Sequence, residues 1–302
     1  MSQIYGEIAA LSAAFMWSVS STLFTKVGKR IGPLSLNALR ITISAFLFSV
    51  SNFILYGTFF PIVSYNQIAI LSLSGIIGLA VGDLAYFGAL VEMGARKAIL
   101  VSSMAPIFSL IGGYILLHEV PTHIALIGIL LVLLGIWIVI IEKEERNENK
   151  KFKTHIFKGT IFGTIAAIGQ GIGVVFSKYG MFYSSIPLNP LSTTVIRVFA
   201  ALPVIWLTLI IWKKPKHILS GLKDRYALKL LIFGSLIGPF IGLWLSMIAI
   251  KYAQVGIAST LLSTTPLMVL PVVYLMDKEK VNLRGIFGAL MAVIGVALIF
   301  LF

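Results

Sequence analysis

One acidic side chain stands inside a long stretch of sequence that is otherwise free of charge. No Asp, Glu, Lys or Arg occurs from Ile41 to Gly82, and Asp83 follows directly. A charge in apolar surroundings of this length is costly unless it is paired or hydrated, so such residues usually serve a function. Tyr86 lies three residues further on, so one helical face would offer a carboxyl and a hydroxyl group together. We expect this pair to bind a proton or a cationic substrate; the alternative is that Asp83 only joins helices through hydrogen bonds.

Polar and aromatic residues recur at helical spacing in other apolar segments. Ser102-Ser103 precede Pro106 and Ser263-Thr264-Thr265 precede Pro266, and a proline leaves a carbonyl group about one turn earlier without its amide donor. An indole or an amide group at depth also needs a partner. Packing of small polar faces between helices is the alternative interpretation. We expect the binding site to include, with Asp83 and Tyr86, the residues Trp17, Ser18, Ser21, Ser102, Ser103, Gln170, Trp244, Ser246, Ser263 and Thr264.

The residue patterns of common catalytic and metal sites are missing from the sequence. It contains no cysteine, and we place its four histidines at helix ends or in loops. It has no HExxH motif, Ser/His pairing, paired intramembrane carboxylates or Gly-rich phosphate loop. The net charge is +13, but the basic residues are spread over several segments instead of forming one stripe with aromatics. We therefore expect no enzyme activity, no metal, no cofactor and no nucleic-acid partner.

The elements that must position these residues are membrane-spanning helices. Hydrophobic residues make up 58% of the chain and charged residues 12%, whereas a soluble domain has roughly a quarter of its residues charged. Uncharged runs of about twenty residues match the thickness of the hydrocarbon layer, and lipid favours helices because it cannot satisfy unpaired backbone groups. We expect an all-α integral membrane protein with ten spans near residues 3–26, 35–56, 67–90, 96–117, 122–141, 158–178, 190–212, 227–250, 254–276 and 281–302.

The basic residues predict how these spans are oriented. With ten spans, all but three of the 24 Lys and Arg residues fall on one side of the membrane, and Lys178, Arg197 and Lys251 fall on the other. Basic residues favour cytoplasmic loops. We expect a multi-pass protein of the cell membrane, surrounded by lipid, with both termini outside the cytoplasm.

The second half of the sequence repeats the first. Gly32-Pro33-Leu34-Ser35, followed by Arg40, recurs 157 residues later as Asn189-Pro190-Leu191-Ser192, followed by Arg197. Later in the chain, six residues recur at a constant offset of 160 positions: Gly78, Gly82, Pro106, Glu119, Gly128 and Gly135 reappear as Gly238, Gly242, Pro266, Glu279, Gly288 and Gly295. We expect a five-helix repeat at 1–141, a charged linker at 142–157 and a second repeat at 158–302. Because each repeat has an odd number of spans, the two must be inverted, as in many transporters.

Charged residues near the predicted span ends suggest a gate. On one side Glu119 would meet Lys178 and Arg197, and on the other side Glu279 would meet Lys26 and Arg40. We expect cross-repeat ion pairs that close one face while the other opens. The alternative is that the basic side chains only reach towards water at helix ends.

Several short motifs resemble those of the drug/metabolite transporter superfamily, in particular its EamA type. They are Ala13-Ala14-Phe15-Met16-Trp17-Ser18, the Pro-Leu-x-x-x-x-x-Arg start at Pro33 to Arg40, Gly-Asp-x-x-Tyr-Phe-x-Ala-Leu at Gly82 to Leu90, Ala-Pro-x-Phe at Ala105 to Phe108, and the acidic residues Glu119 and Glu279. The resemblance spans the whole chain. It implies an exporter of amino acids, metabolites or drugs, or an exchanger of sugar conjugates.

Together these features predict a secondary active transporter, with export as the expected direction. The substrate would be a small metabolite such as an amino acid or amine, bound in a mid-membrane cavity that opens alternately to each side, and protons are the candidate coupling ion. Two alternatives remain: an intramembrane enzyme acting on lipid-linked substrates, and a membrane scaffold without transport. The sequence leaves the oligomeric state undetermined.

Overall fold

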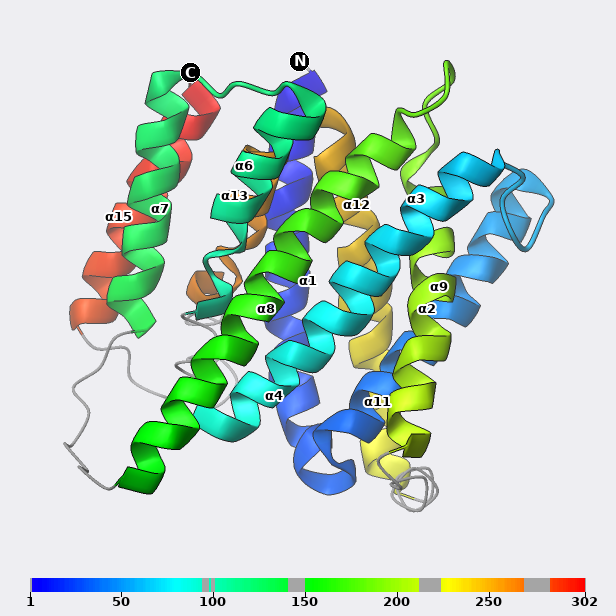
Figure 1. The fold of residues 1–302 in the computed structure, drawn as a ribbon, viewed down its shortest axis with the longest axis horizontal. Helices are drawn as coiled ribbons and strands as arrows, with labels where there is room; N and C mark the ends of the chain where they lie inside the picture. Colours follow the sequence, from blue (N-terminus) through cyan, green and yellow to red (C-terminus); the bar gives the residue numbers. More distant parts are fainter. Residues whose placement is uncertain are drawn as a thin grey trace.

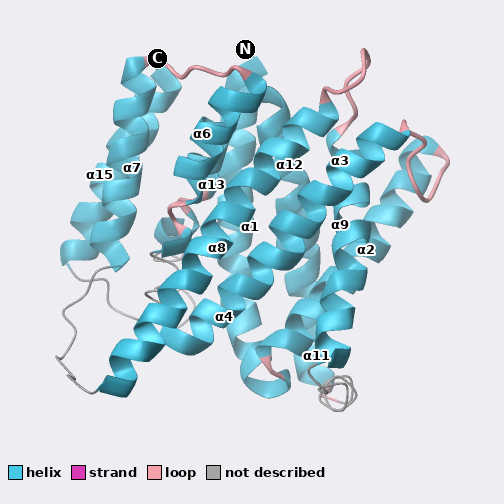
Figure 2. Cartoon of the chain, viewed as in Figure 1, coloured by secondary structure: helices cyan, strands magenta, loops and turns pink. Residues whose placement is uncertain are grey.

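The computed structural model describes residues 2–93, 98, 101–140, 150–211, 224–268 and 283–301. Within these residues every regular element is helical and no strand occurs (Figure 2). Six helices are long and apolar enough to cross a membrane: Gln3–Gly28, Leu34–Tyr56, Tyr65–Ala89, His155–Met181, Pro190–Ile211 and Arg225–Tyr252. Four shorter apolar helices accompany them: Ala105–Leu117, His123–Ile138, Val255–Met268 and Ile286–Ile299. The chain is therefore an all-helical protein with multiple membrane spans.

The first half of the chain begins and ends its helices at recognisable local signals. Gly32, with φ of 82°, separates the first two helices, and Pro33 starts the second, where its missing N–H is not needed. The Ser64 side chain caps the third by accepting a bond from the Gln67 N–H. The elements are α1 Ser2–Ile31, α2 Pro33–Tyr56, α3 Tyr65–Gly75, η1 Ile76–Gly82, α4 Asp83–Met93, α6 Ala105–Leu117 and α7 His123–Ile140.

The second half follows the same order of long, broken and short helices. Its elements are α8 Lys150–Met181, α9 Pro190–Ile211, α11 Arg225–Ser235, η2 Leu236–Gly242, α12 Leu243–Tyr252, α13 Val255–Leu262 and α15 Leu283–Leu301. Helix α8 begins at Lys150, so residues 150–157, which the sequence assigned to the linker, are helical. Residues 142–149 of that segment lie outside the described part of the chain.

The two halves contain a matching irregularity. η1 and η2 are π-helical segments of seven residues each, and the second begins 160 residues after the first. Segments of this kind are rare and often lie at functional sites. Each one joins two α-helical pieces into a single long membrane span, α3–η1–α4 in the first half and α11–η2–α12 in the second. The break therefore occurs at the same place in both halves.

Each half supplies a central helix that packs against the broken span of the other half. Helix α1 packs against α11, η2 and α12, and α8 packs against α3, η1 and α4. Two pairs of equivalent helices also pack together, α2 with α9 and α7 with α15. Figure 1 shows α1 and α8 crossing the middle of the molecule, with the α7–α15 pair at one side. The halves are interleaved, so any space at the centre is shared between them.

Glycines allow the close approach of α8 to η1. An added Cβ atom at Gly173 would lie 2.8 Å from the Gly78 Cα atom, and one at Gly169 would lie 2.9 Å from the Ile77 carbonyl oxygen. Contacts this short leave no room for a side chain, because backbone atoms would have to move. Small residues are what membrane helices use where their backbones come this close.

This packing predicts that Gly173→Ala destabilises the protein by about 1–3 kcal/mol, the usual cost of overpacking. Gly28→Ala is the matched control, because its added Cβ atom would meet only a side-chain atom of Leu36 at 3.4 Å. Alanine is the better helix former, so the control should be neutral or slightly stabilising. Thermal unfolding of the purified protein in detergent measures both. Equal melting temperatures for the two variants would contradict the close-packing account.

Candidate functional site

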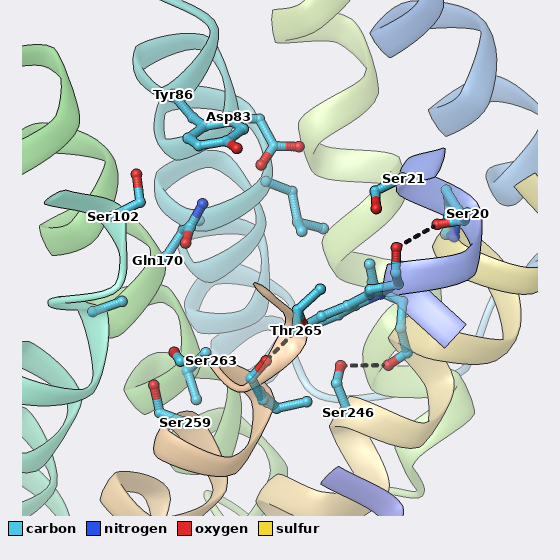
Figure 3. Close-up of a pocket in the computed structure, with 18 of the residues that line it drawn as sticks. Ser20, Ser21, Asp83, Tyr86, Ser102, Gln170, Ser246, Ser259, Ser263 and Thr265 are labelled. Atoms are coloured by element: carbon cyan, nitrogen blue, oxygen red, sulfur yellow. Dashed lines mark hydrogen bonds between the residues drawn. The ribbon is translucent and has the colours of Figure 1, made fainter. Parts of the chain in front are cut away.

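A cavity of about 410 Å³ lies at the centre of the bundle, and both halves of the chain line it. Its wall is formed by α1, α2, η1, α4, α6, α8, α9, η2, α12 and α13 together with residues near Ser102 and Thr265. Figure 3 shows side chains of both halves around one space, with Asp83, Tyr86, Ser102 and Gln170 opposite Ser259, Ser263, Thr265 and Ser246. The cavity is large enough for a small metabolite.

The carboxylate of Asp83 is paired inside this cavity. Asp83 is the first residue of α4, directly after η1, and its Oδ2 accepts a bond of 2.6 Å from Nη2 of Arg40 on α2. Arg40 Nε also donates to Asn37 Oδ1 at 2.9 Å. The side chains of Arg40 and Asp83 are 22% and 17% exposed, so both line the cavity without facing bulk water freely. The sequence placed Arg40 at a gate with Glu279; the structure places it here, and Glu279 lies outside the described residues.

A second guanidinium group, that of Arg197 on α9, also lines the cavity. The residue is only 3% exposed. Its Nη1 donates to the Met247 sulfur at 3.0 Å, and its Nε is buried without a hydrogen-bond partner among the described residues. The expected contact of Arg197 with Glu119 is therefore wrong. The reason is the position of Arg197 two turns inside α9, where the side chain reaches the cavity and not the helix end.

Glu119 instead contacts Lys178 at one end of the bundle. Lys178 Nζ lies 2.5 Å from Glu119 Oε1 and also donates to the carbonyl oxygen of Ala253 at 2.5 Å. Glu119 Oε2 accepts the backbone N–H of Val255 at 2.6 Å. These bonds join the ends of α6, α8, α12 and α13, and we call them the Glu119–Lys178 latch. Lys26, which the sequence predicted to meet Glu279 on the opposite side of the membrane, lies in α1.

The structure brings most of the sequence-predicted binding residues together. Nine line the cavity: Trp17, Ser21, Asp83, Tyr86, Ser102, Ser103, Gln170, Ser246 and Ser263. Three others do not line it: Ser18 and Thr264 are buried, and the centroid of the Trp244 ring lies 6.3 Å from that of Phe240. Each of the three is next to a cavity residue in the sequence. Successive side chains on a helix point about 100° apart, so a neighbour of a cavity residue can face away from the cavity.

Several residues of the cavity wall were not predicted from the sequence. Among them are Ser20, Phe24, Met247, Ser259 and Thr265. Helical spacing could have revealed some of them, because Ser20 and Phe24 follow Trp17 on one face of α1, and Ser259 precedes Ser263 by one turn. No sequence signal identified Arg40 and Arg197 as cavity residues, since both stand near predicted span ends.

The glycines that end the two π-helical segments make room for cavity side chains. An added Cβ atom at Gly242, the last residue of η2, would lie 2.7 Å from Trp17 Cδ1. One at Gly82, the last residue of η1, would lie 3.4 Å from Gln170 Cγ. Trp17 and Gln170 therefore occupy matching places, each on the central helix of one half and against the broken span of the other.

The cavity wall mixes aromatic, hydroxyl and charged groups. Several hydroxyls donate to carbonyls of their own helices: Ser20 to Trp17 at 3.2 Å, Ser246 to Leu243 at 2.7 Å and Thr265 to Leu262 at 2.8 Å (Figure 3). Their oxygens can still accept a bond from a ligand. Within the described residues there is no group of three or more His, Cys, Asp or Glu side chains that could hold a metal ion. The wall suits reversible binding of a small, partly polar molecule.

Comparison with known proteins gives a family match over both halves. The model of the EamA-like transporter family matches residues 4–141 and 157–301. Two curated relatives from Bacillus subtilis (strain 168) carry the names "Uncharacterized transporter YoaV", 26% identical over 136 residues, and "Uncharacterized transporter YvbV", 27% identical over 138 residues. Each match covers 45% of this chain. It covers 47% of YoaV and 45% of YvbV, so the chain spans less than half the length of each relative.

A solved crystal structure has the same fold. It superposes with a TM-score of 0.74 and covers 98% of this chain and 96% of its own, at 16% sequence identity. At that identity the likeness concerns the arrangement of the helices alone.

The ion pair in the cavity predicts strong coupling between its two members. Asp83→Leu or Arg40→Met alone should destabilise the protein by up to about 3 kcal/mol, because each leaves one charge without its partner. The double variant should lose less than the sum of the two single effects. Thermal unfolding in detergent checks this cycle, and strictly additive single effects would show that the two side chains do not depend on each other.

Proposed function

The chain belongs to the EamA-like transporter family and is a membrane transporter, and on this premise we propose that it is a secondary transporter working by alternating access. The observation that carries the proposal is the central cavity, which is lined by both halves of the chain. A site shared in this way can open to either side of the membrane when the halves exchange conformations. The substrate would be a small metabolite with polar and apolar parts, such as an amino acid.

We propose that the protein has ten spans arranged as two inverted repeats, 1–141 and 158–302, joined by residues 142–157. The constant sequence offset, the matching π-helical segments and the reciprocal packing of α1 and α8 support this arrangement. The N- and C-terminal ends also lie at the same end of the molecule in Figure 1, as an even number of spans requires.

The charge bias supports an orientation with both termini outside the cytoplasm, in the cell membrane. Arg40 and Arg197 line the cavity, so neither belongs to a loop. Without them, the side that carries the termini keeps only Lys178 and Lys251, and the bias becomes stronger. In this orientation the Glu119–Lys178 latch lies on the outer side.

We propose that the latch holds the outer side closed in the conformation described here. Glu119 and Lys178 come from different halves, and their bonds to Val255 and Ala253 tie the helix ends together. Opening would break these contacts as the halves move. By the repeat offset, Glu279 with Lys26 would form the corresponding contact on the other side.

Asp83 is our candidate for the coupling group. Its bond to Arg40 holds α4 against α2 while the carboxylate is ionised. Protonation would remove that charge and weaken the contact, so a proton could change the balance between the two conformations. The family resemblance favours export as the physiological direction.

The coupling proposal predicts that Asp83→Asn abolishes uptake driven by a pH gradient but leaves exchange across the membrane intact. Asparagine keeps the shape and an acceptor oxygen for Arg40 but cannot take up a proton. Proteoliposomes with labelled L-phenylalanine and L-leucine as first probes measure both activities. Asp224→Asn is the matched control, because Asp224 is a carboxylate at the start of α11, outside the cavity. Gradient-driven uptake that is unchanged in Asp83→Asn would rule out the coupling role.

The latch proposal predicts that a covalent link between positions 119 and 178 stops transport. The chain has no cysteine, so Glu119→Cys with Lys178→Cys gives a unique pair for a bifunctional methanethiosulfonate reagent. Linked protein should be inactive in the same liposome assay and regain activity when a reductant cleaves the link. Each single cysteine variant, treated in the same way, is the control. Undiminished transport by fully linked protein would show that this end does not need to open.

A further inference from the structure

The two arginines of the cavity occupy equivalent places in the two halves, but only one of them is hydrogen-bonded to a carboxylate. Arg40 and Arg197 follow the same Pro-Leu-Ser segment at the start of α2 and α9. Arg40 is bonded to Asp83, the first residue of α4. The residue 160 positions after Asp83, the first residue of α12, is Leu243, and it lines the cavity. The second half keeps the arginine and lacks the acid.

Arg197 consequently has hydrogen-bonding capacity that the protein does not use. A guanidinium group has five N–H donors. Within the described part of the chain, that of Arg197 makes one hydrogen bond, at 3.0 Å to the sulfur of Met247, which is a weak acceptor. Its Nε has no partner although it is buried. A buried charge in this situation is costly unless something else satisfies it.

The charged groups of the cavity do not balance either. Among the described residues that line it, Arg40 and Arg197 are basic and Asp83 is acidic. The oxygen Oδ2 of Asp83 already accepts the bond from Arg40. The cavity wall therefore carries one more guanidinium group than carboxylate groups, and the single charge of Asp83, which also acts on Arg197, cannot neutralise both.

We propose that Arg197 binds the carboxylate of a small organic ligand in the cavity, at the place that the second half would fill with an acidic side chain. This inference rests on the proposed function, because the ligand is the transported substrate. It narrows the expected class from amino acid or amine to molecules that carry a carboxylate. An amine without one would meet two guanidinium groups and a carboxylate that is already paired.

The surroundings of Arg197 suit such a ligand. Gly78 of η1 lies beside the guanidinium and has no side chain to cover it; an added Cβ atom there would already be in van der Waals contact with Nη2, at 3.4 Å. A planar carboxylate can accept two parallel N–H bonds from a guanidinium group. Elsewhere the wall presents Trp17, Phe24 and Tyr86, whose rings can contact the apolar part of the ligand.

Binding of matched compounds to the purified full-length protein tests the proposal. The probes are 3-phenylpropionate, its amide, phenethylamine, phenylphosphonate and inorganic phosphate, and the readouts are tryptophan fluorescence and thermal shift in detergent. We expect 3-phenylpropionate to bind, and the amide and the amine to bind much more weakly. Arg197→Gln should weaken carboxylate binding by about 10- to 100-fold, the range for a hydrogen bond to a charged group. Arg30→Gln is the control, because Arg30 pairs with Asp224 at an exposed place and should leave binding unchanged.

A second variant tests the same idea by adding the missing acid. Leu243→Asp should supply the carboxylate from within, raise the melting temperature and abolish binding of 3-phenylpropionate. Leu243→Asn introduces a side chain of nearly the same shape as Leu243→Asp but without the charge. It should raise the melting temperature less and weaken the binding of 3-phenylpropionate less. This pair remains informative if Arg197→Gln fails to fold.

Three results would overturn the inference: equal binding of the acid and its amide, unchanged affinity in Arg197→Gln, or phosphate or phenylphosphonate binding better than 3-phenylpropionate. Its failure is distinguishable from failure of the proposed function, because binding is measured without transport. Transport that continues while Arg197 proves irrelevant to binding removes the inference alone. Carboxylates that bind through Arg197 but never cross the membrane remove the transport proposal alone.

Discussion

Charged groups held within a bundle of apolar helices are the constraint on which the centre of this protein depends. A guanidinium or carboxylate group at this depth must find a partner or water, because the surrounding lipid offers neither. Arg40 and Asp83 satisfy each other at 2.6 Å, and Arg197 is left with the sulfur of Met247. The charged groups are therefore paired at the cavity, and on our proposal a ligand there accepts the hydrogen bonds that Arg197 does not use.

The backbone serves this arrangement through its two π-helical segments. η1 ends directly before Asp83, and η2 ends directly before Leu243. The glycines at their ends leave room for Gln170 and Trp17, which come from the central helices α8 and α1. Because each central helix packs against the broken span of the other half, a shift of one half alters the cavity wall on both sides. This interleaving is what makes a shared cavity suitable for exchange between two conformations.

The asymmetry between the halves carries as much information as their likeness. Equivalent helices, glycines and arginines build the same framework twice, and that framework explains the cavity. Leu243 stands where the first half has Asp83, so the two sides of the cavity differ. Arg40 is paired with a carboxylate, whereas Nε of Arg197 has no hydrogen-bond partner among the described residues. The Glu119–Lys178 latch joins the two halves at one end of the bundle, with further bonds to the backbone of Ala253 and Val255. On our proposal, the substrate is recognised where the repeats differ, at Arg197 and Leu243.

The sequence by itself determined the helical membrane architecture and much of the cavity. Uncharged runs of about twenty residues predict spanning helices, because backbone groups in lipid must bond within their own segment. An isolated acid such as Asp83 in an apolar span also indicates a site, since its charge must be paired or hydrated there. Only the tertiary structure decided which charges meet. Arg40, Arg197 and Lys178 all stand near helix ends in the sequence, and pairing depends on helix rotation and on contacts between segments far apart in the chain. Ser21 lines the cavity, whereas Ser18, one turn earlier on α1, is buried, and no local pattern shows which part of a helical face meets the cavity.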